Sequence, residues 1–183
     1  MLSNNRMLLW LLPFLIFVII AYFSWLGLHN DVRLLPSPLI NHSMPTFQAQ
    51  SLLKPKELIS EKNFLGKVTV LNVFATWCIA CHAEHTVWLE AREDLPNVQL
   101  FGLNYKDQNA KTQKWLKQYG NPYEKILVDT AGSIGINLGV YGTPETFIID
   151  RHGIIRYKYV GAVSPTVWKT ILLPEVKKWH TFS

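Results

Sequence analysis

Apolar residues occur in this 183-residue chain as one long run near the N-terminus and as several short runs farther along. The long run, residues 7–28, contains 22 residues and no charged side chain. As a helix it would be roughly 33 Å long, which matches the hydrocarbon thickness of a bilayer. Because it is apolar on all sides, it lacks the one-sided pattern of a helix packed on a globular core. We therefore predict a transmembrane anchor over residues 7–28.

A cleaved signal peptide is the alternative interpretation of this run. Signal peptides have a shorter apolar core of about 7–15 residues, followed by a cleavage site of small residues. The run in this chain is longer, contains two tryptophans and ends without a clear site of that kind. The short segment before it carries Arg6. This weak positive bias favours a cytoplasmic tail at residues 1–6 and a domain on the other side of the membrane.

The short apolar runs alternate with polar segments and predict one domain over residues 41–183. A linker at residues 29–40 precedes it, and its prolines favour an extended spacer. Apolar β-branched runs predict strands, and longer runs with helical character predict helices. The strands are expected at residues 68–74, 98–104, 126–128, 146–150 and 154–160, and the helices at 78–93, 107–119 and from 164 onward.

The order of these elements indicates an α/β fold. Strands joined by helices come first and are expected to be parallel, whereas the last two strands are joined by a tight turn at residues 151–153. Asp107 and Ser164 are candidate helix caps, and Gly120 follows the expected end of the second helix. Pro174 is a candidate break in the last helix. We predict a central mixed sheet with helices on both faces.

Charge excludes one class of partner. The formal net charge is +5, but the basic residues form no run interleaved with aromatic residues. We interpret them as a solvated surface, so nucleic acid is not an expected partner.

The chain has two cysteines, Cys78 and Cys81, at the junction of a predicted buried strand and a predicted helix. Unpaired N–H groups and a partial positive charge at a helix start stabilise a thiolate. In Cys-x-x-Cys motifs this lowers the pKa of the thiol to about 3.5–7.5. We predict that Cys78 is an exposed attacking thiolate and that Cys81, one turn deeper, is the resolving thiol.

Three other interpretations of the pair stay open. Cys-x-x-Cys followed by His82 matches the attachment pattern of haem c. The two sulfurs together with His82 and His85 also have the spacing of a copper or zinc site. A structural staple is the third, although a four-residue loop removes little chain entropy. We expect no cofactor and no metal, because a strand-to-helix junction leaves little room to bury a haem.

Two stretches of the chain resemble a known family. They are LNVFATWCIACHAEH, residues 71–85, and GVYGTPETFIID, residues 139–150. Both resemble the thioredoxin-like proteins of cytochrome c maturation, of the DsbE/CcmG type. Trp-Cys-x-x-Cys is common to thioredoxin-like proteins, but Gly-Val-Tyr-Gly-x-Pro-Glu-Thr is far more specific. Segments 101–107, 115–123 and 152–161 are similar too, so the resemblance covers about residues 40–183.

The resemblance implies a thioredoxin-like fold tethered to the outer face of a bacterial inner membrane. It implies a periplasmic reductase for disulfides of apocytochrome c or of a haem-lyase dithiol component. A membrane thiol transporter of the DsbD or CcdA kind would reduce its own disulfide again. Haem attachment needs free thiols in an oxidising compartment, which gives such a reductase its purpose. A general periplasmic reductase is the alternative within this class, and a metal or haem carrier is the alternative outside it.

The resemblance also assigns residues to a site around the cysteines. Thr143 and Pro144 match the family's cis-proline loop, which would place the Thr143 backbone beside Cys78, where an extended substrate segment pairs with it. Glu84 matches the acidic residue of the pattern Cys-x-x-Cys-x-x-Glu and is expected to handle protons for Cys81.

Four further positions complete this expected site. Trp77 is expected to shield the sulfur and to contact the substrate, and Glu145 is a second candidate for substrate contact. Ordinary thioredoxins carry a buried aspartate six residues before the first cysteine, whereas this chain has Asn72 there. Asparagine does not titrate, so the expected proton role falls to Glu84. His82 departs from many family members and would tune the thiolate through a positive charge.

Overall fold

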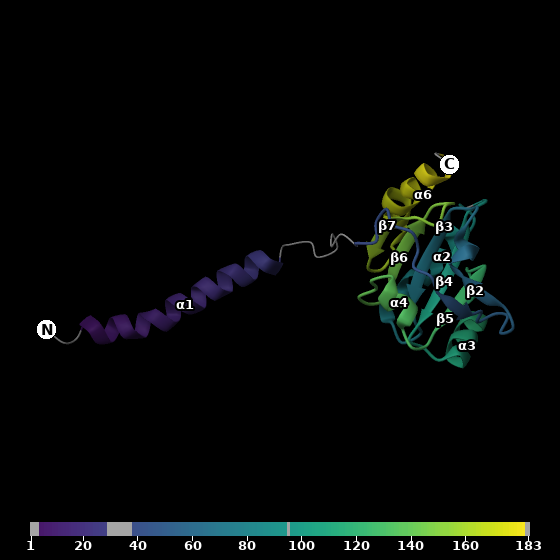
Figure 1. Ribbon diagram of the computed structural model, residues 1–183. Helices are drawn as coiled ribbons and strands as arrows, with labels where there is room; N and C mark the ends of the chain where they lie inside the picture. The colour runs from purple at the N-terminus through teal and green to yellow at the C-terminus, as the bar shows by residue number, and fades with distance from the viewer. Residues whose placement is uncertain (1–3, 29–37, 95, 182–183) are drawn as a thin grey trace. The chain divides into compact units, whose positions relative to one another are not determined.

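The computed structural model describes residues 4–28, 38–94 and 96–181 (Figure 1). The chain divides into two compact units, Met1–Leu35 and Pro36–Ser183. In the first, helix α1 (Asn4–Leu28) includes the whole segment predicted as an anchor. Among the described residues, no helix is both long and apolar enough to cross a membrane. Most of the predicted linker, and residues 1–3 of the predicted tail, lie outside the described residues.

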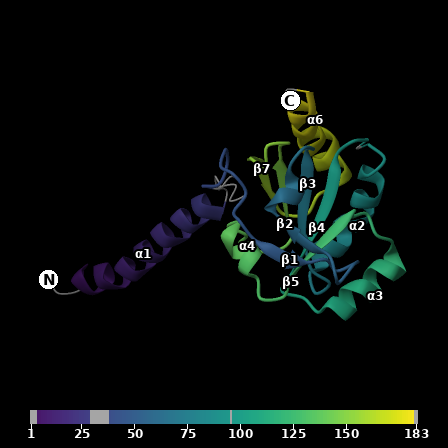
Figure 2. The same cartoon turned by 45° about the vertical axis from the view of Figure 1, so that its right-hand side comes forward.

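A five-stranded sheet forms the centre of the second unit (Figures 1 and 2). Its strand order is β5-β4-β3-β6-β7. The pairs β3–β4 and β4–β5 are parallel, while β6 is antiparallel to both β3 and β7. The predicted mixed sheet with an antiparallel pair at the end of the chain is therefore confirmed. The strands are β3 (Thr69–Phe74), β4 (Gln99–Tyr105), β5 (Lys125–Asp129), β6 (Glu145–Ile149) and β7 (Ile155–Val160).

Long helices cover one face of this sheet. They are α2 (Ile79–Ala91), α3 (Asn109–Tyr119) and a C-terminal helical segment. That segment consists of α5 (Pro165–Val167), the π-helical turn η3 (Trp168–Leu172) and α6 (Leu173–Thr181). Their apolar side chains form one buried cluster with the sheet, which includes Val87, Trp88, Trp115, Leu116, Trp168, Leu172 and Val176.

Small elements cover the opposite face, and the hydrophobic pattern did not predict them. They are β1 (Gln48–Gln50), β2 (Leu58–Ser60), the 3-10 helix η2 (Glu61–Phe64) and α4 (Ser133–Asn137). Each is too short to show a hydrophobic period of its own. They complete a second buried cluster that includes Ala49, Ile59, Phe64, Leu71, Phe101, Ile134 and Phe147.

Two of the predicted helix ends are confirmed. The Ser164 hydroxyl accepts the N–H of Val167, and Pro165 occupies the first position of α5. Gly120 follows α3 with a φ of 93°, a backbone conformation that glycine adopts without steric cost.

The other two predictions need correction. Gln108, not Asp107, is the cap residue of α3, because the Asp107 carboxylate accepts the N–H groups of Gln108 and of Thr76, each at 2.6 Å. Pro174 does not break the last helix. Pro174 is the second residue of α6, which begins directly after η3. The hydrogen-bonding pattern changes from π to α at this point, so the lack of an N–H group on proline costs little.

Gly102 lies in β4 at a position where no side chain fits. A Cβ atom there would come within 2.7 Å of the Phe74 ring and 3.1 Å of the Tyr123 ring. We expect Gly102→Ala to lower the free energy of unfolding by about 1–3 kcal/mol, because the two rings must leave their positions. Urea unfolding followed by tryptophan fluorescence measures the effect. Gly142→Ala is the control, since its Cβ meets nothing within 4 Å, and equal stability of the two variants would contradict the prediction.

Candidate active site around the cysteine pair

The two cysteines lie at the junction of β3 and α2, as predicted. Every residue of β3 is buried, so the strand delivers the chain to the helix start inside the domain. Cys78 caps α2, and its sulfur accepts the N–H of Cys81 at 3.2 Å. Both are free cysteines. Only 6% of Cys78 and 2% of Cys81 are exposed, so the prediction of an exposed attacking sulfur is wrong for this conformation.

A loop distant in sequence covers Cys78. The peptide bond between Thr143 and Pro144 is cis, as predicted. The Cys78 thiol donates to the Thr143 carbonyl oxygen, with Sγ 3.4 Å from that oxygen. This confirms the expected place of the Thr143 backbone beside the sulfur. Its pairing with an extended substrate stays a prediction.

Three hydrogen bonds that involve side chains help to hold the turn before Cys78. The Thr76 N–H donates to Asp107, and the Thr76 carbonyl oxygen lies 2.8 Å from His82 Nε2. The Trp77 indole N–H donates to the Lys106 carbonyl oxygen at 3.2 Å. The turn is therefore fixed, while 57% of Trp77 stays exposed next to the sulfur. This position suits the predicted contact with a substrate.

Protein groups engage both ring nitrogens of His82. The Trp115 indole N–H, which is only a donor, points at Nδ1 from 3.3 Å. Nδ1 is therefore an acceptor, and Nε2 carries the proton that it donates to Thr76. Neither nitrogen then has a lone pair left for a metal or haem iron. The expected tuning of the thiolate by a positive charge on His82 stays a prediction. Within the described ranges, no three His, Cys, Asp or Glu side chains gather as metal ligands.

Glu84 lies one turn after Cys81 and is 1% exposed. Its carboxylate accepts the Asn72 side-chain N–H and the Val163 backbone N–H, each at 2.8 Å. Burial raises the pKa of Glu84 to about 7, while the dipoles of Trp88, Val163 and Asn72 oppose the rise. A carboxyl group with this pKa gains and loses a proton readily at neutral pH. That property suits the predicted proton handling for Cys81.

Glu145 lies beneath the cis-proline loop and has no exposed surface. Its Oε2 is 3.0 Å from Nζ of Lys158, whose side chain is 3% exposed. Its Oε1 accepts the Tyr141 N–H at 2.9 Å, and Lys158 donates to the Gly139 carbonyl oxygen at 2.6 Å. This buried ion pair therefore ties the loop at residues 139–144 to β7. In this conformation Glu145 is too buried to contact a substrate directly, and it affects substrate binding only by holding this loop in place.

Sequence reasoning missed two residues of this site. Lys158 is the partner of Glu145, and the Tyr123 hydroxyl donates to Asn72 at 2.7 Å. A single lysine inside a predicted strand of the terminal hairpin was a signal for Lys158, because a buried Glu145 on the neighbouring strand needs a counter-charge. No comparable signal marks Tyr123, since a buried tyrosine is ordinary.

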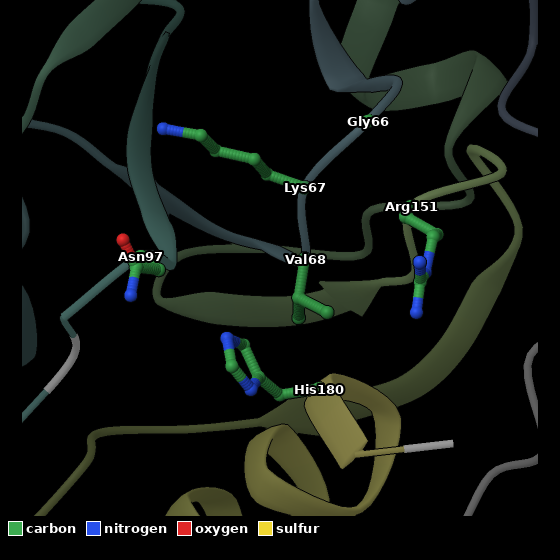
Figure 3. A pocket seen from close by; sticks show the side chains of 6 residues that line it. All are labelled: Gly66, Lys67, Val68, Asn97, Arg151 and His180. Carbon is green, nitrogen blue, oxygen red and sulfur yellow. The ribbon is translucent and has the colours of Figure 1, made fainter. Parts of the chain in front are cut away.

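A cavity of about 270 Å³ lies away from the cysteines (Figure 3). Val68, in its wall, directly precedes β3, whereas Cys78 follows the other end of that strand. The cavity and the dithiol are therefore at opposite ends of β3, and the sulfur chemistry takes place outside this cavity. Its lining residues are Gly66, Lys67, Val68, Asn97, Arg151 and His180.

The fold and the cysteine pair agree with the comparisons to known proteins. Residues 40–172 match the model of the Redoxin family. The crystal structure of a secreted thiol-disulfide isomerase from Corynebacterium glutamicum is similar with a TM-score of 0.64 and 22% identity. The match covers 73% of this chain and 85% of that one. The class of protein is therefore a thiol:disulfide oxidoreductase with a thioredoxin-like fold.

Relatives of higher identity narrow this class. The thiol:disulfide interchange protein DsbE of Pseudomonas aeruginosa is 43% identical over 164 residues, which are 90% of this chain and 90% of its own length. The DsbE of Tatumella citrea is 44% identical over 155 residues, 84% of this chain and 81% of its own. The chain belongs to the Redoxin family as a DsbE-type thioredoxin-like protein.

The raised pKa of Glu84 predicts a pH dependence of stability. The same group in the unfolded chain titrates near 4.5. Between pH 4.5 and 7 the folded state therefore binds more protons, so the free energy of unfolding falls as the pH rises, by about 3 kcal/mol. Urea unfolding across this range should show that Glu84→Gln removes this part of the slope. A variant of the exposed Glu93, Glu93→Gln, should keep the slope; a Glu84→Gln protein that also keeps it would refute the assignment.

The buried ion pair predicts a second stability effect. Lys158→Met leaves the Glu145 carboxylate buried without its counter-charge, and we expect the free energy of unfolding to fall by about 3–5 kcal/mol. Adding Glu145→Gln removes the unpaired charge and should restore much of the loss. Urea unfolding of the single and double variants measures both effects. A double variant no more stable than Lys158→Met would rule out the ion pair as the cause.

Proposed function

We propose that this protein is a membrane-anchored periplasmic reductant in cytochrome c assembly. The observation that carries the proposal is the segment Gly139–Asp150, which has the DsbE/CcmG pattern. It contains the cis peptide bond of the loop over Cys78, and the Thr143 carbonyl oxygen in that loop lies 3.4 Å from Cys78 Sγ. A relative of 43% identity over most of both chains is named a thiol:disulfide interchange protein, which supports the exchange chemistry of this role. In this role residues 7–28 anchor the chain in the bacterial inner membrane, and the domain lies in the periplasm.

The proposed reaction is a two-step exchange. The Cys78 thiolate attacks one sulfur of a substrate disulfide, forms a mixed disulfide and releases the other substrate sulfur as a thiolate, which takes up a proton. Cys81 then loses its proton to Glu84 and attacks Cys78 Sγ. This step releases the second substrate thiolate and leaves a disulfide between the two cysteines. Two electrons pass to the substrate, which is apocytochrome c or a haem-lyase dithiol component.

The oxidised protein must regain two electrons before the next turnover. A membrane thiol transporter of the DsbD or CcdA kind supplies them in this proposal, by the same exchange in the opposite direction. The covered Cys78 then meets two partners in turn at one surface. The helix start stabilises the Cys78 thiolate, which attacks the substrate disulfide and is the leaving group when the second transporter thiol breaks the mixed disulfide.

A general periplasmic reductase is the second candidate, and the surface near Cys78 supports it. Trp77, Ile79 and Tyr141 are 57%, 88% and 67% exposed, respectively. Ile79 and Trp77 adjoin Cys78 in sequence, and Tyr141 belongs to the loop that covers it. Apolar side chains of this kind contact many peptide sequences, because they require no particular charge on the partner.

Trapping the partner separates the two candidates. In cells, Cys81→Ser should hold Cys78 in a mixed disulfide, because the resolving thiol is gone. Mass spectrometry of the trapped complexes should recover apocytochrome c or a haem-lyase component. The double variant Cys78→Ser/Cys81→Ser is the matched control and should trap nothing.

Other outcomes point elsewhere. A broad set of unrelated envelope proteins would favour the general reductase. Purified wild-type protein whose two thiols did not cycle in a thiol/disulfide buffer would contradict both reductase roles. A Soret band, or one bound Cu or Zn with loss of titratable thiols, would instead indicate a carrier.

A further inference from the structure

Three buried side chains form a hydrogen-bonded row beneath the cysteines. The Tyr123 hydroxyl donates to Asn72 Oδ1 at 2.7 Å, and Asn72 Nδ2 donates to Glu84 Oε1 at 2.8 Å. The exposed fractions of the three side chains are 2%, 0% and 1%, in that order. The row therefore runs, shielded from solvent, from the segment before β5 to the helix that carries Cys81.

The Tyr123 hydroxyl determines which way the Asn72 amide faces. Burial, and then the negative charge of Glu84, raises the pKa of Tyr123 well above 10, so the phenol keeps its proton. A buried hydroxyl proton needs an acceptor, and among the described residues the hydrogen bonds give it the Asn72 oxygen. The amide nitrogen is then the atom that faces Glu84. The orientation follows from this accounting of donors and acceptors, although oxygen and nitrogen have similar shapes.

Packing fixes the position of the hydroxyl. The Tyr123 ring stacks on Phe74, with centroids 4.9 Å apart and an interplanar angle of 18°. Its backbone N–H donates to the Asn121 side chain at 3.0 Å. Gly102 leaves room for both rings, because a Cβ at that position would clash with them. The phenol therefore cannot turn away from Asn72 without disturbing the core.

We propose that Tyr123 is a positioning residue for Glu84, because its hydroxyl holds the Asn72 amide in the orientation that donates to the Glu84 carboxylate. A turned amide would present its oxygen to Glu84, and only a protonated carboxyl group pairs with an oxygen. In the turned amide, the Asn72 N–H group would also face the Tyr123 hydroxyl proton, so two donors would meet without an acceptor. The hydroxyl thus favours the ionised, proton-accepting form of Glu84. The consequence for exchange rests on the proposed proton role of Glu84, but the positioning itself does not.

Few other ionisable groups face Glu84. β3 and residues 160–164, which supply its two hydrogen-bond donors, contain none. On its own helix, Cys81 precedes it by one turn. Burial lowers the pKa of the adjacent His85, whose Nε2 lies 3.1 Å from the Gly120 carbonyl oxygen. The charged neighbour of Tyr123, Glu124, is exposed. The row through Asn72 is therefore the direct route by which Tyr123 acts on Glu84.

The first test removes one oxygen atom. Tyr123→Phe keeps the ring and deletes the hydroxyl, so the Asn72 amide is free to turn. In the oxidised full-length protein, the Glu84 pKa read from the ¹³C shift of its Cδ should rise by about one unit. Tyr119→Phe is the matched control, because that half-exposed hydroxyl interacts with Gln118. An unchanged Glu84 pKa in Tyr123→Phe would overturn the proposal, even if the protein became less stable.

A double-mutant cycle tests the route through Asn72. Asn72→Ala should itself raise the Glu84 pKa, because the carboxylate loses a donor. In that background, adding Tyr123→Phe should have no further effect on the Glu84 pKa, since the connecting amide is gone. A further rise equal to that of Tyr123→Phe alone would show that the hydroxyl acts on Glu84 by another path, and would overturn the proposal. If Tyr123→Phe alone folds poorly, Asn72→Ala alone still tests the row, since an unchanged Glu84 pKa in that variant would overturn the proposal.

The pH profile of disulfide exchange separates this inference from the proposed function. If Glu84 accepts the Cys81 proton, the midpoint of the resolving step in Tyr123→Phe should move to higher pH by the same amount as the Glu84 pKa. A raised Glu84 pKa with an unmoved exchange profile would support the positioning role of Tyr123 and reject the proton role of Glu84. The Glu84 pKa therefore tests the positioning role of Tyr123, and the pH profile of exchange tests the proton role of Glu84.

Discussion

The burial of β3 on both faces is the constraint on which the rest of the site depends. Because this strand pairs with β4 on one side and β6 on the other, its end is fixed at the centre of the domain. Cys78 follows that end at the start of α2, and β6 begins beside it with Glu145. The strand that places the dithiol therefore also places the cis-proline loop. Asn72, in the same strand, reaches Glu84 underneath.

Sequence reasoning predicted the parts of the protein that depend on local pattern. The central strands, the long helices, the capping Ser164 and the strand-to-helix place of Cys78 all follow from hydrophobic period and helix-end chemistry. It failed where contacts distant in sequence decide. The place of Thr143 beside Cys78, 65 residues away, followed from the family resemblance and not from local pattern, and local pattern did not show that Cys78 is buried. The short elements β1, β2 and α4 show no hydrophobic period of their own. The hydrogen bond from Trp115 to His82 joins residues 33 positions apart, so no local pattern shows it.

Two carboxylates at this site are buried in different ways. Glu145 has a lysine partner at 3.0 Å, so its charge is compensated and it holds a loop. Glu84 has N–H donors but no cation beside it among the described residues, and burial raises its pKa to about 7. The contrast is between a carboxylate held in an ion pair and one whose pKa is raised by burial. Both match the same family resemblance, and only their partners distinguish them.

The cover over Cys78 has a consequence for selectivity. Cys78 is 6% exposed and its sulfur lies 3.4 Å from the Thr143 carbonyl oxygen, so an extended chain would reach the sulfur more easily than a folded surface would. Newly exported polypeptides have such segments before they fold, whereas disulfides inside finished proteins rarely do. The same covering loop would thus spare the structural disulfides of mature neighbours. In the role proposed above, the protein would discriminate by the foldedness of its target as well as by its chemistry.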